Sequence, residues 1–142
     1  MRLIRLAIFL LAVLMASASG AHAARVNVDI DLSEQKMTVR LDNRVLYLWP
    51  VSTARPGYRT PVGTYRPYRL ERMWYSTIYD YAPMPWSIFF RGGYAIHGTT
   101  EISRLGRPAS HGCVRLHPDH ARTLYYLIRE AGMRETRIVV RP

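Results

Sequence analysis

The sequence has a single cysteine, Cys113, among 142 residues. One cysteine excludes an intramolecular disulfide. In an oxidising compartment it would be a free thiol, an intermolecular bridge, a metal ligand or a buried side chain. The sequence also has no second long apolar run after residues 6–15, and that run is shorter than the roughly 20 residues of a membrane span. We therefore expect no stable membrane span.

The first residues have the pattern of a secretory signal peptide. Arg2 and Arg5 precede the apolar run, and small residues ending in Ala21-His22-Ala23 follow it. This pattern predicts cleavage after Ala23 and export to the periplasm. The remaining residues, 24–142, have the length of one domain.

Acidic side chains are scarce, with ten against twenty basic ones and a formal net charge of +10. Removal of the signal peptide would leave about +8. A basic balance can indicate a nucleic-acid partner, but export removes that partner, so we expect no nucleic acid. An anionic envelope or acidic wall polymer fits better, unless the charge only keeps the protein soluble.

The apolar pattern predicts a domain that opens with strands. Apolar and polar residues alternate over 26–32 and again over 37–41, and residues 45–51 form a third apolar run that contains β-branched and aromatic residues. Two prolines and two glycines in 55–63 predict an ordered loop. Residues 69–86 are aromatic, interrupted by proline and without a clean period. We predict a long loop or flap there, which either covers a ligand or packs on the core.

The second half contains a predicted hairpin and a predicted helix. Residues 88–96 form an apolar hairpin around two glycines, and the hairpin ends at His97. Pro118 suits the first position of a helix, and Gly132 suits its C-terminal cap. A last strand over 138–140 completes one mainly-β domain.

Cys113 lies in a segment with a chemically suggestive order. If residues 110–116 are extended, His111, Cys113 and Arg115 share one face, and the apolar residues between them face the core. A thiol beside a cation and a base favours the reactive thiolate. Gly112 would let a substrate approach, and its N–H and that of Cys113 could bind a developing oxyanion.

A second histidine lies within reach of the same thiol. His97 ends the preceding hairpin, and across adjacent strands it could reach Cys113. The residues alone therefore leave two candidate bases, His97 and His111.

These residues match a known family. His97-Gly98-Thr99, followed by Ser110 to Arg115 with the order Ser-His-Gly-Cys-Val-Arg, resembles the signature of the L,D-transpeptidase catalytic domain, also called YkuD-like. Segments 28–35, 60–65 and 116–132 are also similar to family segments. The resemblance implies a β-sandwich-like catalytic domain with one helix after the cysteine segment.

The resemblance also implies roles for individual residues. Cys113 is the nucleophile, His97 its general base, and the backbone carbonyl of Gly98 orients His97. His111 is then of secondary importance in catalysis.

We expect substrate contacts from Ser110, Gly112 and Arg115. Many members of the family have asparagine at the position of Arg115. Its guanidinium could bind a substrate carboxylate or only balance a carboxylate of the protein.

The function that the resemblance implies is acyl transfer on the peptide stems of peptidoglycan. Cys113 attacks a tetrapeptide stem, D-alanine leaves, and the thioester passes to an amine or to water. An amine acceptor gives a cross-link or anchors an envelope protein, whereas water makes the enzyme an L,D-carboxypeptidase. The thioester conserves the energy of the old amide where no ATP is present, so we expect no cofactor and no metal.

Two alternatives follow from the same residues. His111, Cys113, His117 and His120 offer ligand types for zinc within ten positions. A non-catalytic wall-binding domain of the same fold is the other alternative, although intact Cys113 and His97 argue against it.

The signal pattern gives the first prediction. N-terminal sequencing of the protein recovered from the periplasm should begin at Ala24, because the small residues before it fit the cleavage site. Recovery of the full-length chain in the cytoplasm alone would contradict export.

Overall fold

The computed structural model describes residues 22–142. The predicted signal peptide lies outside these residues except for its last two positions, so its cleavage stays a prediction. No helix among the described residues is long and apolar enough to cross a membrane.

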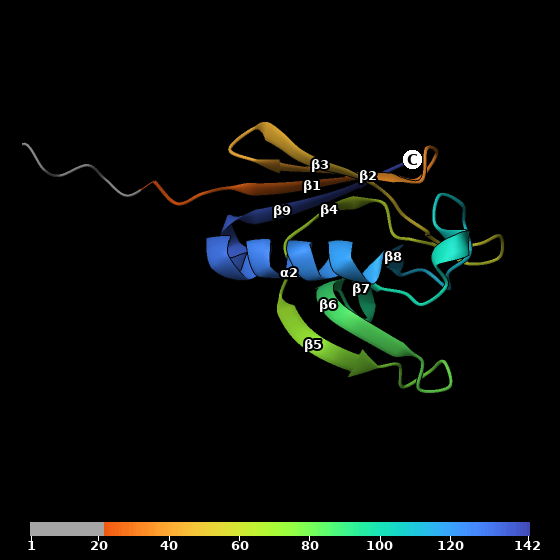
Figure 1. Ribbon diagram of the computed structural model, residues 1–142. Coiled ribbons are helices and arrows are strands. Elements are labelled where there is room, and N and C mark those ends of the chain that lie inside the picture. Colours follow the sequence, from red (N-terminus) through yellow and green to blue (C-terminus); the bar gives the residue numbers. More distant parts are fainter. Residues whose placement is uncertain (1–21) are drawn as a thin grey trace, which may run out of the picture.

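The first sheet has five strands in the order β3-β2-β1-β9-β4 (Figure 1). Its strands are β1 (Val26–Asp31), β2 (Lys36–Leu41), β3 (Arg44–Pro50), β4 (Gly63–Tyr65) and β9 (Thr136–Arg141). β1 and β9 are parallel, and the other neighbours are antiparallel. The strands predicted from the alternating residues after the signal peptide are therefore confirmed, and the last strand joins them from the far end of the chain.

The second sheet has four strands in the order β5-β6-β7-β8. Its strands are β5 (Arg69–Tyr75), β6 (Pro83–Arg91), β7 (Tyr94–Gly98) and β8 (Val114–Leu116). The hairpin predicted to end at His97 is confirmed as β6 and β7. β7 and β8 run parallel, so the chain must cross over between them. This connection includes the short 3₁₀ helix η2 (Ile102–Arg104).

Helix α2 (Pro118–Ala131) lies between the two sheets (Figure 1). Pro118 occupies its first turn and Gly132, with a φ of +102°, its C-terminal cap, as the sequence predicts. A 3₁₀ helix, η3 (Met133–Glu135), then leads into β9. Among the described residues α2 is the one α-helix, and the predicted mainly-β fold is confirmed.

The core lies where α2 meets both sheets. Val28 and Ile138 from the first sheet, Ile96 from the second and Leu124 from the helix are fully buried in one cluster. Burial of each such side chain contributes about 1.5–3 kcal/mol. The helix thereby fixes the second sheet, which carries Cys113, against the first.

Residues 69–86 do not form the long loop that the sequence analysis predicts. They contain β5, a tight turn at 76–82 and the start of β6. Aromatic residues favour strands. Pro83 and Pro85 are compatible with β6 because they precede Ile88, where pairing of β6 with β7 begins. On that side of β6 the prolines have no neighbouring strand, so the missing N–H groups cost no hydrogen bond of the sheet.

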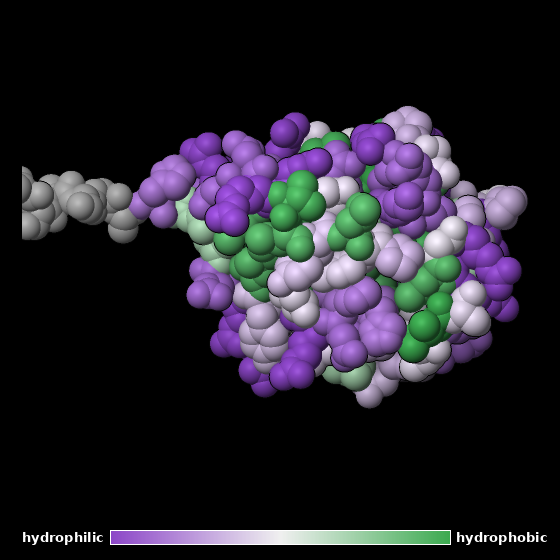
Figure 2. All heavy atoms as spheres, turned by 45° about the horizontal axis from the view of Figure 1, so that its top comes forward, coloured by the Kyte–Doolittle hydropathy of each residue, from purple (hydrophilic) through white to green (hydrophobic). Residues whose placement is uncertain are grey.

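β3 is more exposed than its apolar sequence predicts. Val45, Leu46 and Leu48 are exposed by 59%, 39% and 60%. β3 is an edge strand, so it contacts the sheet on one side only. Hydrophobic side chains gather on the face of the molecule that carries the β2–β3 hairpin (Figure 2).

Candidate active site

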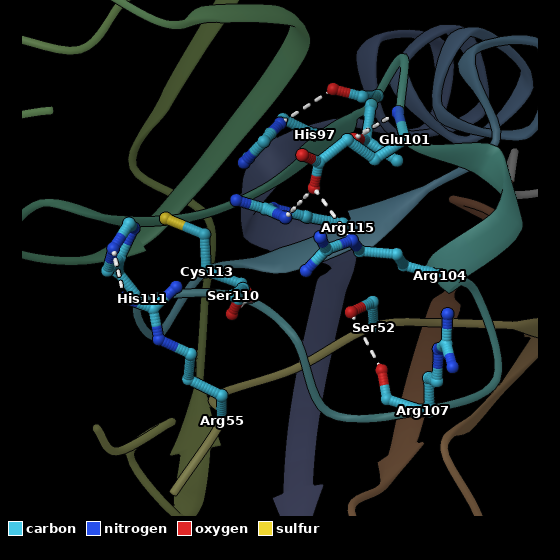
Figure 3. Close-up of polar contacts among 12 residues, drawn as sticks. Ser52, Arg55, His97, Glu101, Arg104, Arg107, Ser110, His111, Cys113 and Arg115 are labelled. Atoms are coloured by element: carbon cyan, nitrogen blue, oxygen red, sulfur yellow. Dashed lines mark hydrogen bonds and ion pairs between the residues drawn. The ribbon is translucent and has the colours of Figure 1, made fainter. Parts of the chain in front are cut away.

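Parallel pairing of β7 with β8 brings the predicted residues together. Ile96 is opposite Val114, and His97 is opposite Arg115. Cys113 precedes Val114 and is therefore diagonal to His97 across the two strands. In Figure 3 both side chains lie on the same side of this strand pair.

The segment around Cys113 shows the expected alternation of burial. Residues 110, 112, 114 and 116 are buried, whereas residues 111, 113 and 115 are half-buried. The backbone nevertheless bends at 111–113, and Gly112 has a φ of +139°. His111, Cys113 and Arg115 all line one cavity of about 620 Å³, together with His97.

His97 is held in one tautomer by the backbone. Its Nδ1 lies 2.7 Å from the carbonyl oxygen of Gly98 (Figure 3). A carbonyl only accepts hydrogen bonds, so Nδ1 carries the proton and Nε2 has the free lone pair. Burial, with a smaller effect of Arg115, lowers the pKa of His97 to about 4. At neutral pH the ring is therefore uncharged and able to accept a proton at Nε2.

The Cys113 thiol is also neutral at rest. Its Sγ lies 3.8 Å from the carbonyl oxygen of Gly93. Burial raises the pKa of the thiol, while a backbone hydrogen bond from Ala95 and the charge of Arg115 act in the opposite direction. Both shifts favour the uncharged forms, a thiol and an imidazole, in the free site.

Ser110 is committed to the loop that carries the thiol. Its Oγ accepts a hydrogen bond from the Gly112 N–H at 3.0 Å and donates one to the Cys113 carbonyl at 2.7 Å. The side chain is 1% exposed. The hydroxyl therefore positions the loop, and because Ser110 also lines the cavity, its expected substrate contact stays a prediction. The Gly112 N–H is likewise occupied in the free site, and its part in an oxyanion site stays a prediction.

Gly112 is required by its surroundings. A Cβ at this position would lie 2.6 Å from Cε1 of Tyr94 and 2.9 Å from the carbonyl oxygen of Arg59. Thr60 donates a hydrogen bond from Oγ1 to the Gly112 carbonyl at 2.8 Å. The loop is thus clamped from the side of the β3–β4 connection, with no room for a side chain.

Arg115 is paired with a carboxylate of the protein. Its Nη1 lies 2.8 Å from Oε2 of Glu101, which is also 3.9 Å from Nε of Arg104 (Figure 3). Arg115 is 19% exposed in its side chain, whereas Glu101 is 49% exposed. The guanidinium is thus already balanced, although both residues line the cavity.

The comparisons with known proteins agree with this geometry. Residues 25–140 match the model of the YkuD family, described as the L,D-transpeptidase catalytic domain. The chain belongs to this family. The match covers the strands, the helix and both histidine-containing motifs, so it does not rest on the cysteine motif alone.

Three relatives illustrate the likeness. YkuD of Bacillus subtilis, whose name assigns it to the L,D-transpeptidases, is 25% identical over 91 residues, which are 64% of this chain and 53% of that protein. An L,D-transpeptidase from Mycobacterium smegmatis has a TM-score of 0.76 at 23% identity, covering 84% of this chain and 59% of the other. One from Xylanimonas cellulosilytica has a TM-score of 0.70 at 28% identity, covering 85% and 62%.

This L,D-transpeptidase domain thus spans between a half and two thirds of the length of these relatives. The comparisons show its family and fold. The geometry of the site identifies the candidates for the residues that act in it.

His111 is in a poor position to act as the base in this transpeptidase domain. Its Nε2 lies 3.0 Å from Nη2 of Arg55, and a guanidinium only donates, so Nε2 is the acceptor and Nδ1 carries the proton. The ring stacks on Tyr79 at 4.1 Å between centroids. Burial and the charge of Arg55 lower its pKa.

The four residues considered for zinc do not form one cluster. His111 and Cys113 line the cavity, whereas His120 stacks on Trp49 at 4.7 Å and His117 caps α2 by accepting the Asp119 N–H. Among residues 22–142 no group of three or more His, Cys, Asp or Glu side chains is placed to hold a metal ion.

Sequence reasoning missed three contributors to the site. Thr60 lies in a segment that resembles the family, but its contact with Gly112 joins positions 52 apart. Glu101 gives no signal in the sequence, because its role depends on the crossover that brings it to Arg115. Tyr79 was seen only as one of several aromatic residues in a predicted loop.

The charges around the thiol give a prediction for its reactivity. Alkylation of Cys113 by iodoacetamide should still accelerate as the pH rises past the ordinary pKa of cysteine, because burial holds the thiol protonated and only the thiolate reacts. Arg115→Gln should slow alkylation several-fold at a fixed pH near neutrality, because it removes a charge that favours the thiolate.

Arg104→Gln is the matched control, because it removes the other partner of Glu101 and should leave the rate nearly unchanged. A wild-type alkylation rate already maximal at neutral pH would contradict the raised pKa of the Cys113 thiol. An unchanged rate in Arg115→Gln would contradict the effect of Arg115 on that pKa.

Proposed function

We propose that this protein is a periplasmic peptidoglycan L,D-transpeptidase in which Cys113 is the nucleophile and His97 the general base. The observation that supports it most is the pair of neutral groups on one cavity. The thiol faces the same space as a buried imidazole whose Nδ1 is fixed by Gly98. A nucleophile, a base and a group that orients the base are the parts that acyl transfer requires.

The first half-reaction transfers an acyl group to sulfur. Sγ of Cys113 gives its proton to Nε2 of His97 and bonds to the carbonyl carbon of the third stem residue. The amide C–N bond then breaks, and D-alanine leaves as an amine that takes the proton from His97. The product is a thioester, and no proton is gained or lost overall.

The low pKa of His97 assists the second of these proton transfers. Burial and the neighbouring Arg115 disfavour the charged imidazolium, so it is a strong acid once formed. It therefore returns its proton readily to the departing amine, which needs protonation to leave. The same environment keeps the ring neutral and ready before the next attack.

Arg115 contributes charge to this reaction. Its guanidinium stabilises negative charge on the nearby sulfur, and it can bind the terminal carboxylate of the stem if Glu101 releases it. Ser110 and Gly112 shape the loop that presents the thiol, and substrate contacts from both residues stay a prediction.

The acceptor of the acyl group is an amine or water. A cavity of about 620 Å³ is large enough for a peptide segment by comparison with ordinary ligand sites of roughly 300–1,000 Å³. A side-chain amine of a second stem gives a cross-link, an amine of an envelope protein gives an anchored protein, and water gives a tripeptide. The basic mature chain would be attracted to an anionic wall polymer.

The assignment of the base gives one prediction. His97→Ala should lower the steady-state rate of D-alanine release by about 10²- to 10⁴-fold, the usual contribution of a positioned base. His111→Ala should cost much less, because His111 directs its lone pair at Arg55. Circular dichroism should show that both variants are folded. A larger loss in His111→Ala than in His97→Ala would reverse the assignment.

Acylation of the thiol gives the central prediction. Purified mature protein incubated with disaccharide-tetrapeptide and a chelator should show an intact mass of protein plus substrate minus D-alanine. The adduct should map to Cys113 and be absent in Cys113→Ala. Because the family resemblance implies acylation by carbapenems, a carbapenem should modify the same sulfur. Its adduct should decay more slowly than the thioester formed with the stem.

Product analysis identifies the acceptor in the same experiment. Tripeptide indicates water, and a dimer joined through two third-position residues indicates cross-linking. Absence of both adduct and product with folded, reduced protein would contradict the catalytic function and favour the non-catalytic wall-binding alternative.

A further inference from the structure

A second depression lies beside the catalytic cavity. It has a volume of about 300 Å³ and is lined by Arg59, Pro61, Val62, Arg91 and Tyr94. Tyr94 lines both spaces, so the two spaces adjoin each other at this residue. The β3–β4 loop forms one side of the depression, and the end of β6 with the start of β7 forms the other.

The two arginines of this depression have no carboxylate partner. Within residues 22–142 every ion pair joins other side chains. The guanidinium of Arg91 contacts only an uncharged partner, with Nη1 3.3 Å from the Tyr65 hydroxyl and Cζ 5.9 Å from its ring centroid. Arg59 is exposed. Two unneutralised guanidinium groups on one small cavity favour an anion, and their planar donors match a carboxylate.

The depression packs directly against residues 110–113, the nucleophile loop that carries Cys113. A Cβ at Gly112 would collide with both the Tyr94 ring and the Arg59 carbonyl, so these three groups are already in contact. Thr60, the next residue along the chain, donates to the Gly112 carbonyl. The loop that carries Cys113 therefore borders the depression that Arg59 and Arg91 line.

The chemistry of the proposed substrate supplies a matching group. A peptidoglycan stem contains γ-linked and diamino acids, and their free carboxylates lie outside the scissile amide. The carboxylate of the departing D-alanine is next to that amide and would remain in the cavity of Arg115. A carboxylate of an earlier stem residue is far enough from the reacting carbonyl to lie beyond the tyrosine.

We infer that Arg59 and Arg91 form a subsite that binds a carboxylate of the peptide stem while the stem is presented to Cys113. This inference rests on the proposed function, because it identifies the part of the same substrate that is recognised. The apolar side of the depression, Pro61 and Val62, contacts the aliphatic portion of the stem. The subsite positions the substrate and takes no part in proton transfer.

The test measures equilibrium binding, so it does not depend on turnover. Disaccharide-tetrapeptide is titrated into Cys113→Ala protein by calorimetry, with and without Arg59→Gln/Arg91→Gln. Loss of hydrogen bonds to a charged group predicts a Kd about 10- to 100-fold weaker in the double variant. Arg129→Gln/Arg137→Gln removes the same charge from exposed positions elsewhere and should change the Kd little.

A second ligand identifies the group that is bound. It is the same disaccharide-tetrapeptide with every carboxylate except that of the terminal D-alanine converted to an amide. This ligand should bind weakly to both proteins, and the Arg59→Gln/Arg91→Gln change should then have almost no effect. Iodoacetamide, which is uncharged, should alkylate Cys113 at the wild-type rate in the Arg59→Gln/Arg91→Gln protein, which shows that the loop is intact.

The outcomes separate this inference from the proposed function. Equal weakening for both ligands, equal weakening in both double variants, or no binding to Cys113→Ala would overturn the subsite. Acylation of Cys113 with unchanged binding in Arg59→Gln/Arg91→Gln would retain the enzyme and remove the subsite. Arginine-dependent binding without any acylation would retain the subsite and contradict catalysis.

Discussion

The pairing of three residues of β8 with β7 is the constraint on which the site depends. Val114 and Leu116 are buried on one face, and this fixes the register that puts Arg115 opposite His97. A slip of one residue would turn Cys113 and Arg115 into the core and bring apolar side chains to the cavity. Ser52 holds the same register from the other side, with backbone hydrogen bonds of 2.8 and 3.0 Å to Arg115.

Burial around the strand pair of β7 and β8 determines the protonation of His97 and Cys113. His97 loses its charge because the protein removes it from water, and Cys113 keeps its proton for the same reason. Arg115 is the cation that acts on the pKa of both groups, and it is paired with Glu101. Both shifts therefore favour uncharged side chains in the free site.

The sequence predicted the parts of this structure that depend on local pattern. The alternating residues of β1 and β2, the helix from Pro118 and the face shared by Cys113 and Arg115 follow from periodicity. The exposure of β3 and the strands within 69–86 depend on what lies beside them in the sheets. The hydrogen bonds of Ser110 could not be predicted from sequence, because only the bend at 111–113 brings the two backbone groups within reach of its hydroxyl.

The contacts that hold the nucleophile loop against the β3–β4 connection have a consequence for folding. Arg55 and Thr60 reach His111 and Gly112 across 56 and 52 positions, so these contacts require a long segment of the chain to be closed, at a cost in entropy. The bend that presents Cys113 therefore needs residues 55–60 in place as well as the strand pair of β7 and β8. A chain in which this segment has not yet closed would carry Cys113 without the burial that raises the pKa of its thiol.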